Sequence, residues 1–214
     1  MTLSPSTRVF FALPAVLALV AVLFAGQVQA QSSNDILDRL RDRYESTDAL
    51  RARFVQTIGD ASMEGTLTLR GDAYRIETGD QVLVTDGTTA WVYSAPDQQV
   101  LVNDAIEDET AFSPADFFTN YPDRFDVEVI GTESIDGARH DRLKLTPKNA
   151  DAFLREVTLF VRSTDALPTR VQIVDGNGTR VGFDLRDVEV NPRLSSDVFR
   201  FVAPEGTDVV DLRS

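Results

Sequence analysis

Few residues of this 214-residue chain are of the types that perform catalysis or bind metal ions. The chain has no cysteine and one histidine, His140, which has charged neighbours on both sides and is expected to be an exposed strand residue. A Ser-His-Asp triad would have to use this histidine, and no G-x-S-x-G segment presents a serine. Zinc sites are usually built from histidine and cysteine, so the composition argues against one.

Carboxylates are numerous, but their spacing marks no site. The acidic stretch 104–109 lacks the alternating ligands and the glycine of a calcium loop, and it favours a solvated loop. Among the 34 Asp and Glu residues, two could form the catalytic carboxylate pair of a glycosidase, but the sequence singles out no such pair. We therefore expect no enzyme, no cofactor and no metal site. A net charge of −13 makes nucleic acids and anionic membrane surfaces unfavourable partners.

The first thirty residues predict a secretory signal peptide. Arg8 is the only charge ahead of the apolar run 9–25, and Val28-Gln29-Ala30 provides small residues for cleavage before Gln31. The alternative is a membrane anchor, but the apolar run is short for crossing a bilayer. The prediction is an exported periplasmic protein with no stable membrane insertion.

The remaining residues, 31–214, predict a single domain of mainly β structure. Ser33-Asn34-Asp35 can cap a helix that continues to about residue 48 with apolar residues at helical spacing. Ser113 and Pro114 suggest a second, short helix near 113–121. From Arg53 onward apolar residues alternate with a period of two. The predicted strands are Phe54–Ile58, Met63–Leu69, Tyr74–Thr78, Val82–Thr85, Ala90–Ser94, Gln99–Val102, Phe125–Ile130, Arg139–Leu145, Arg155–Val161, Thr169–Val174, Arg180–Val190 and Val198–Val202.

A sheet of about 11 antiparallel strands must curl, and two helices cover little of its apolar side. Either it closes into a barrel, or it stays partly open over an apolar cavity, with a helical lid made of the N-terminal helix and the short helix near 113–121. Both arrangements favour a protein that holds a ligand inside. The stretch 82–102 is typical of such a wall, because the turns Asp86-Gly87 and Pro96-Asp97 join strands without reactive groups.

Several short segments, in this order along nearly the whole mature chain, resemble the periplasmic outer-membrane lipoprotein carriers of the LolA family. Each alone is ordinary strand and turn chemistry. The segments are Phe54-Val55-Gln56-Thr57, Glu64-Gly65-Thr66-Leu67, Leu69 to Arg75, Asp86-Gly87-x-x-x-Trp91-x-Tyr93, Leu145-Thr146-Pro147-Lys148, and Phe199 to Gly206.

The resemblance implies an incomplete antiparallel β-barrel closed by a helical lid, which shields lipoprotein acyl chains between the two membranes. The implied partners are acylated lipoproteins, an inner-membrane lipoprotein-releasing ABC transporter and an outer-membrane acceptor, and the implied state is a monomer. The alternative is a periplasmic lipid-binding sensor or regulatory module of the same fold that acts through a protein partner. The lipidated acceptor itself is disfavoured, because the chain has no cysteine to carry a lipid.

In the family an arginine after the second strand bonds to the lid, and Arg70 occupies the matching position. Gly71 replaces the proline that follows it in the family. Strict alternation places the side chain of Arg70 on the other face of the strand from Leu67 and Leu69. Arg70 therefore reaches the lid only if the strand bends or bulges at Gly71. Arg75 is the alternative lid contact.

The expected cavity lining combines strand residues with two aromatic residues of the lid. Each is equally well explained as ordinary core. The set is Leu67, Leu69, Tyr74, Ile76, Trp91, Tyr93, Phe117, Phe118, Leu143, Leu145, Val157 and Leu159.

Overall fold

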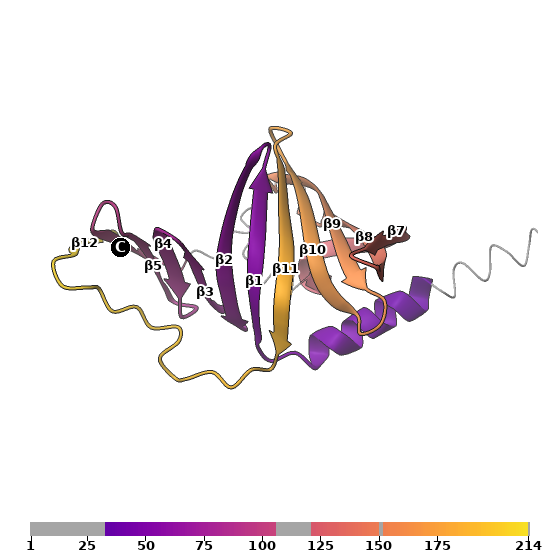
Figure 1. The fold of residues 1–214 in the computed structure, drawn as a ribbon, viewed down its shortest axis with the longest axis horizontal. Coiled ribbons are helices and arrows are strands. Elements are labelled where there is room, and N and C mark those ends of the chain that lie inside the picture. The colour runs from indigo at the N-terminus through magenta and orange to yellow at the C-terminus, as the bar shows by residue number, and fades with distance from the viewer. Residues whose placement is uncertain (1–32, 106–120, 150–151, 214) are drawn as a thin grey trace, which may run out of the picture.

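A computed structural model describes residues 33–105, 121–149 and 152–213, which form one large sheet and a helix that precedes it in the chain (Figure 1). Twelve strands follow the order β12-β6-β5-β4-β3-β2-β1-β11-β10-β9-β8-β7. Every described pair is antiparallel except β12 with β6, which is parallel. The two edge strands lie at opposite sides of the molecule, so the sheet stays open. The expected incomplete antiparallel barrel is confirmed, with twelve strands instead of about eleven.

The helix covers residues 33–45 and precedes the first strand. The strands are β1 (Leu50–Ile58), β2 (Ala61–Arg70), β3 (Ala73–Thr78), β4 (Gln81–Thr85), β5 (Thr89–Ser94), β6 (Gln99–Asp104), β7 (Phe125–Ile135), β8 (Ala138–Pro147), β9 (Leu154–Arg162), β10 (Leu167–Asp175), β11 (Arg180–Val190) and β12 (Asp208–Asp211). A four-residue helix, α3 (Tyr121–Arg124), leads into β7. The short helix expected near 113–121 otherwise lies outside the described residues.

The predicted strand at Val198–Val202 is wrong. These residues form no strand, and the last strand of the chain is β12 instead. The side chain of Phe201 lies against Tyr93 on β5, with ring centroids 5.7 Å apart. Phe201 therefore packs on the sheet instead of extending its hydrogen-bond ladder.

Turns follow the signals in the sequence. In the β4–β5 turn, the Asp86 carboxylate accepts hydrogen bonds from the backbone N–H of Thr88 (2.9 Å) and Thr89 (2.8 Å). In the β7–β8 turn, Asp136 and Gly137 both have positive φ, at 49° and 78°. This is the backbone of a two-residue type I′ hairpin, which Asp-Gly favours. These turns fix which residues of neighbouring strands face one another.

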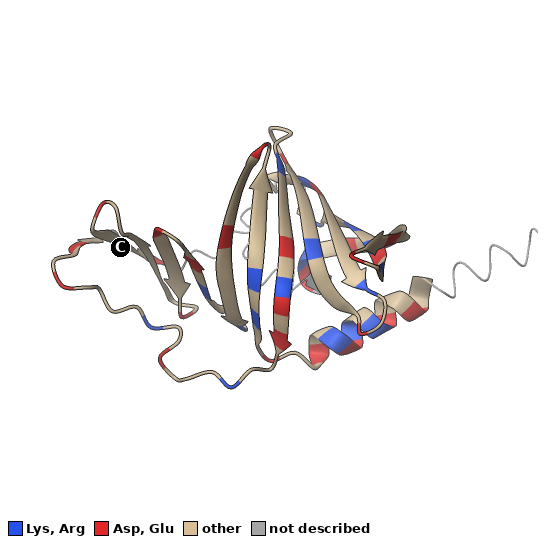
Figure 2. Ribbon diagram, viewed as in Figure 1, with Lys and Arg blue, Asp and Glu red and all other residues tan. Residues whose placement is uncertain are grey.

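The two faces of the sheet differ in chemistry. We call the face that carries Phe54, Leu67 and Leu143 the inner face, because Leu40 of the helix packs against this side. Charged residues lie along β1, β11 and β10 (Figure 2), and the register places several of them on the opposite, outer face. There Arg53 pairs with Asp187 and Arg170 with Asp184. The inner face is therefore the side on which an apolar ligand can be held.

Candidate functional site

The inner face of β8, β9 and β10 carries a buried apolar patch. Leu143, Leu145, Val157 and Leu159 are all 0 % exposed, and Val171 is 2 % exposed. Leu143 lies directly opposite Leu159, and Leu145 opposite Val157, so the four form one patch. Leu40 of the helix packs against this patch. Alternation in the sequence predicts one apolar face for Leu143 and Leu145 and one for Val157 and Leu159, and their role as cavity lining stays a prediction.

A second apolar patch covers the inner face of β1, β2 and β3. Leu67 lies opposite Ala52 on β1 and Ile76 on β3, while Leu69 lies opposite Tyr74. Leu67 is 4 % exposed and Leu69 0 %, whereas Tyr74 and Ile76 are half-buried. Phe183 on β11 packs against both patches. The eight expected strand residues outside β5 thus lie on one continuous face.

Trp91 and Tyr93 do not share this face, which corrects the expected lining. Trp91 lies opposite Val84, and Val84 opposite Arg75, whose neighbours Tyr74 and Ile76 point to the inner side. Trp91 and Tyr93 are therefore outer-face residues. In β5 the inner positions belong to Ala90 and Val92. Phe117 and Phe118 lie outside the described residues.

Arg70 is the last residue of β2 and is exposed. It pairs with Ala73 in a regular register with no bulge, so alternation leaves it on the outer side relative to Leu69. Gly71 follows it with a φ of 56°. Arg75 donates from Nε to Glu77 Oε1 at 2.7 Å, also on the outer face. Residues 106–120, which include most of the short lid helix expected near 113–121, are not described, so the gating role of Arg70 stays a prediction.

The turn after Arg70 nevertheless lies near the helix. Burial raises the pKa of Tyr44, on the last turn of the helix, and the carboxylates of Asp123 and Asp72 raise it further. Asp72 belongs to the β2–β3 turn, two residues beyond Arg70. The end of β2, the helix and α3 therefore approach one another around Tyr44.

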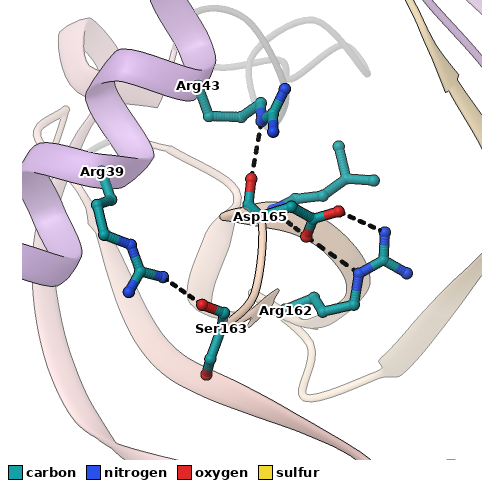
Figure 3. A network of polar contacts seen from close by, with 6 residues as sticks. Arg39, Arg43, Arg162, Ser163 and Asp165 are labelled. Atoms are coloured by element: carbon teal, nitrogen blue, oxygen red, sulfur yellow. Dashed lines mark hydrogen bonds and ion pairs between the residues drawn. The ribbon is translucent and has the colours of Figure 1, made fainter.

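Two arginines fasten the helix to the β9–β10 turn, which Figure 3 shows from close by. Arg39 donates to the backbone oxygen of Ser163 at 2.7 Å, and Arg43 donates from Nε to the backbone oxygen of Asp165 at 2.8 Å. Arg39 also lies 3.9 Å from the buried carboxylate of Asp141 on β8. We call these contacts the arginine clasp.

The turn that receives the clasp is itself held by an ion pair. Arg162 donates to both carboxylate oxygens of Asp165, at 3.0 and 2.7 Å. These hydrogen bonds from Arg162 hold the pKa of Asp165 below its ordinary value, against an opposing effect of burial. Sequence reasoning missed the clasp, because its acceptors are backbone oxygens that carry no residue-specific signal.

A pocket of about 300 Å³ lies between the helix and this turn. Its walls are Arg39, Asp42, Arg43, Ser46, Asp165 and Ala166. Five of these six residues are polar or charged, so the pocket does not suit an acyl chain. Any apolar ligand belongs on the inner face.

His140 is buried, which corrects the expectation of an exposed strand residue. It is 3 % exposed, and its Nδ1 lies 3.0 Å from the backbone oxygen of Ala138. It sits opposite Arg162 and Glu133, whose long side chains can cover it. The His, Cys, Asp and Glu residues of the described segments form no group of three or more that could hold a metal ion. Nor do those segments contain a helix long and apolar enough to cross a membrane.

Comparisons with known proteins agree with this geometry. Residues 45–202 match the family model described as "Outer membrane lipoprotein carrier protein LolA". An outer-membrane lipoprotein carrier protein of Azotobacter vinelandii is 30 % identical, covering 91 % of this chain and 97 % of its own. One from Alcanivorax borkumensis is 27 % identical, covering 91 % and 95 %.

Among solved structures, an uncharacterized conserved protein of Thermus thermophilus superposes with a TM-score of 0.57 at 16 % identity. The match covers 83 % of this chain and 98 % of that one. At this identity the likeness concerns the fold alone.

Proposed function

Because this chain belongs to the outer membrane lipoprotein carrier protein LolA family, we propose that it binds lipoprotein acyl chains on the inner face and carries them through the periplasm. The family consists of non-enzymatic lipid-binding carriers, so the chain is not an enzyme. The observation that carries the proposal is the continuous apolar inner face, which runs from β3 through β1 to β8.

The energetics of the cargo explain why a carrier is needed. A triacylated anchor has on the order of 45 methylene groups, and burying each is worth about 0.8 kcal/mol, which sums to about 35 kcal/mol. Such an anchor does not cross water unshielded. An apolar wall of leucine, valine and isoleucine replaces the membrane interior without forming directional bonds that would hinder release.

We propose that the expected lining residues that lie on the inner face contact the cargo. They come from both patches, and none needs a reactive group, because the protein only has to shield the acyl chains from water. They are Leu67, Leu69, Tyr74, Ile76, Leu143, Leu145, Val157 and Leu159.

We further propose the route. The mature protein, released by cleavage before Gln31, receives lipoproteins from an inner-membrane ABC transporter and delivers them to an outer-membrane acceptor, working as a monomer. The segment resemblance to the carrier family supports this route. A surface with net charge −13 in the full chain, or −14 once the signal with its single Arg8 is removed (−13 − 1), also favours a protein that stays off anionic membranes.

The experiment that tests this function is purification of the mature protein from the periplasm, followed by mass spectrometry of the material that co-purifies. Acylated lipoproteins are expected. Depletion of the protein should then leave outer-membrane lipoproteins in the inner membrane. Correct lipoprotein placement after depletion would show that the carrier function is wrong, and recovery of one regulatory protein instead of lipoproteins would favour the sensor alternative.

A further inference from the structure

Three large apolar side chains are exposed at one end of the sheet. Ile58 is 45 % exposed, Met63 43 % and Phe153 53 %. Ile58 ends β1 and Met63 lies near the start of β2, both on the inner face. Phe153 precedes β9, and its ring lies against Gly176 in the β10–β11 turn, 3.2 Å from where a Cβ would stand. We call these three residues the apolar rim.

The rim is continuous with the buried interior. Ile58 lies opposite Val181 on β11, Val181 opposite Ile173 on β10, and Ile173 opposite Val157 on β9. The exposed fraction falls from 45 % at Ile58 to 0 % at Val157 along this row of apolar residues. An acyl chain that moves along this row would stay in contact with apolar side chains from the solvent to the core.

The other end of the sheet is held by the helix. The arginine clasp joins the helix to the β9–β10 turn, where Leu167 pairs with Arg162. The β10–β11 turn is at the opposite end of the same strand, where Asp175 pairs with Leu154. Leu40, between the clasp residues on the helix, is 2 % exposed. Moving the helix would therefore break the clasp and expose a core leucine.

From these observations we propose that acyl chains enter the inner face across the apolar rim, while the clasped helix stays in place as a fixed cap. Ile58, Met63 and Phe153 are the first residues that an incoming chain touches. Their exposure has a use in this role, since exposed apolar side chains that gather at one place can form an interaction site. The proposal rests on the carrier function and adds the point of access.

The first test replaces the rim residues by acids. The double variant Ile58→Asp/Met63→Asp is expected to slow association of a fluorescent triacylated lipopeptide by about tenfold or more, equivalent to about 1.4 kcal/mol in the barrier. Val202→Asp is the matched control, because Val202 is 74 % exposed and lies outside the rim. All three positions are exposed, and circular dichroism should show an unchanged fold and melting temperature.

The second test fixes the helix. Since the chain has no cysteine, Arg39→Cys/Ser163→Cys introduces a unique pair that a reductant-cleavable bis-maleimide can join. The cross-linked protein should bind the lipopeptide at the rate of the same variant after cleavage. Unchanged association in the rim variant would overturn the proposal, and so would binding that cross-linking blocks and cleavage restores. If the wild-type protein bound no lipopeptide at all, the carrier function itself would fall.

Discussion

The ring of Phe54 on β1 lies across Gly65 on β2, directly opposite it in the register. A Cβ on Gly65 would stand 2.5 Å from Cζ of Phe54 and 2.5 Å from the backbone oxygen of Glu77. The ring fills the space that any side chain at this position would need. Phe54 thereby shields the backbone of β2 in the middle of the inner face.

Replacing Gly65 by alanine should destabilise the fold. The Phe54 ring can rotate away, but the backbone oxygen of Glu77 belongs to the β3 ladder and cannot, so overpacking of about 1–3 kcal/mol is expected. Urea unfolding followed by circular dichroism measures the loss. The control is Gly79→Ala, where no atom lies within 4 Å of the added Cβ. An equal loss of stability in Gly65→Ala and Gly79→Ala would contradict the expected clash between the added Cβ at Gly65 and the backbone oxygen of Glu77.

The Arg162–Asp165 ion pair should make the free energy of unfolding depend on pH in the acidic range. Because the pKa of Asp165 is lower in the folded protein than in the unfolded chain, the carboxylate contributes stability above its unfolded value of about 3.9. That contribution is lost as the pH falls through the folded pKa. The decline in unfolding free energy below about pH 4 should therefore be shallower in Asp165→Asn than in the wild type.

Arg162→Gln tests whether the arginine is the cause. It should flatten the acid dependence as Asp165→Asn does, and the double variant should add little to either change. If the double variant flattened the dependence by the sum of both, Asp165 and Arg162 would act independently.

The fluorescence of the only tryptophan should barely respond to cargo. Trp91 lies on the outer face, so an acyl chain on the inner face does not touch it. Titration with a triacylated lipopeptide is expected to leave the emission maximum unchanged. The matched control Trp91→Phe/Val92→Trp moves the indole to the inner face, and its emission should shift to shorter wavelength on binding. A shift in the wild type would place Trp91 in the cavity after all.

Arg70→Leu tests the lid contact that the family resemblance implies. We expect altered uptake or release of lipoproteins, measured by transfer between inner-membrane vesicles and the acceptor, with little change in stability because Arg70 is exposed. Arg75→Leu is the comparison, since Arg75 bonds to Glu77 on the outer face. Unchanged transfer in Arg70→Leu would remove the gating role, and a defect in Arg75→Leu alone would assign it to Arg75.

The sequence predicted most strands because their signals are local. Asp86 and Asp136 begin turns that require a positive φ, which the following glycine adopts readily. The alternation of apolar residues marks the strands between such turns. Alternation likewise gave Leu143 one face with Leu145, and Leu159 one face with Val157.

Features that depend on distant partners were not predicted. Alternation shows that Trp91 and Tyr93 share a face, but the register with β4 decides which face it is. Phe201 has strand-like neighbours and instead packs on Tyr93. His140 is buried by residues that reach it only through the register of β7 and β9. None of these outcomes follows from the alternation of a single strand, because each depends on which residues the neighbouring strands and segments bring opposite it.

The parallel pairing of β12 with β6 bears on how the protein avoids aggregation. Without β12, the six-residue strand β6, with Val100 and Val102 buried, would present its unpaired backbone groups at the margin of the sheet. Such a margin can template pairing with another chain. β12 covers it with a four-residue strand that begins and ends in aspartate, Asp208 and Asp211. The margin left to solvent is short and negatively charged, which makes it a poor template for a second copy.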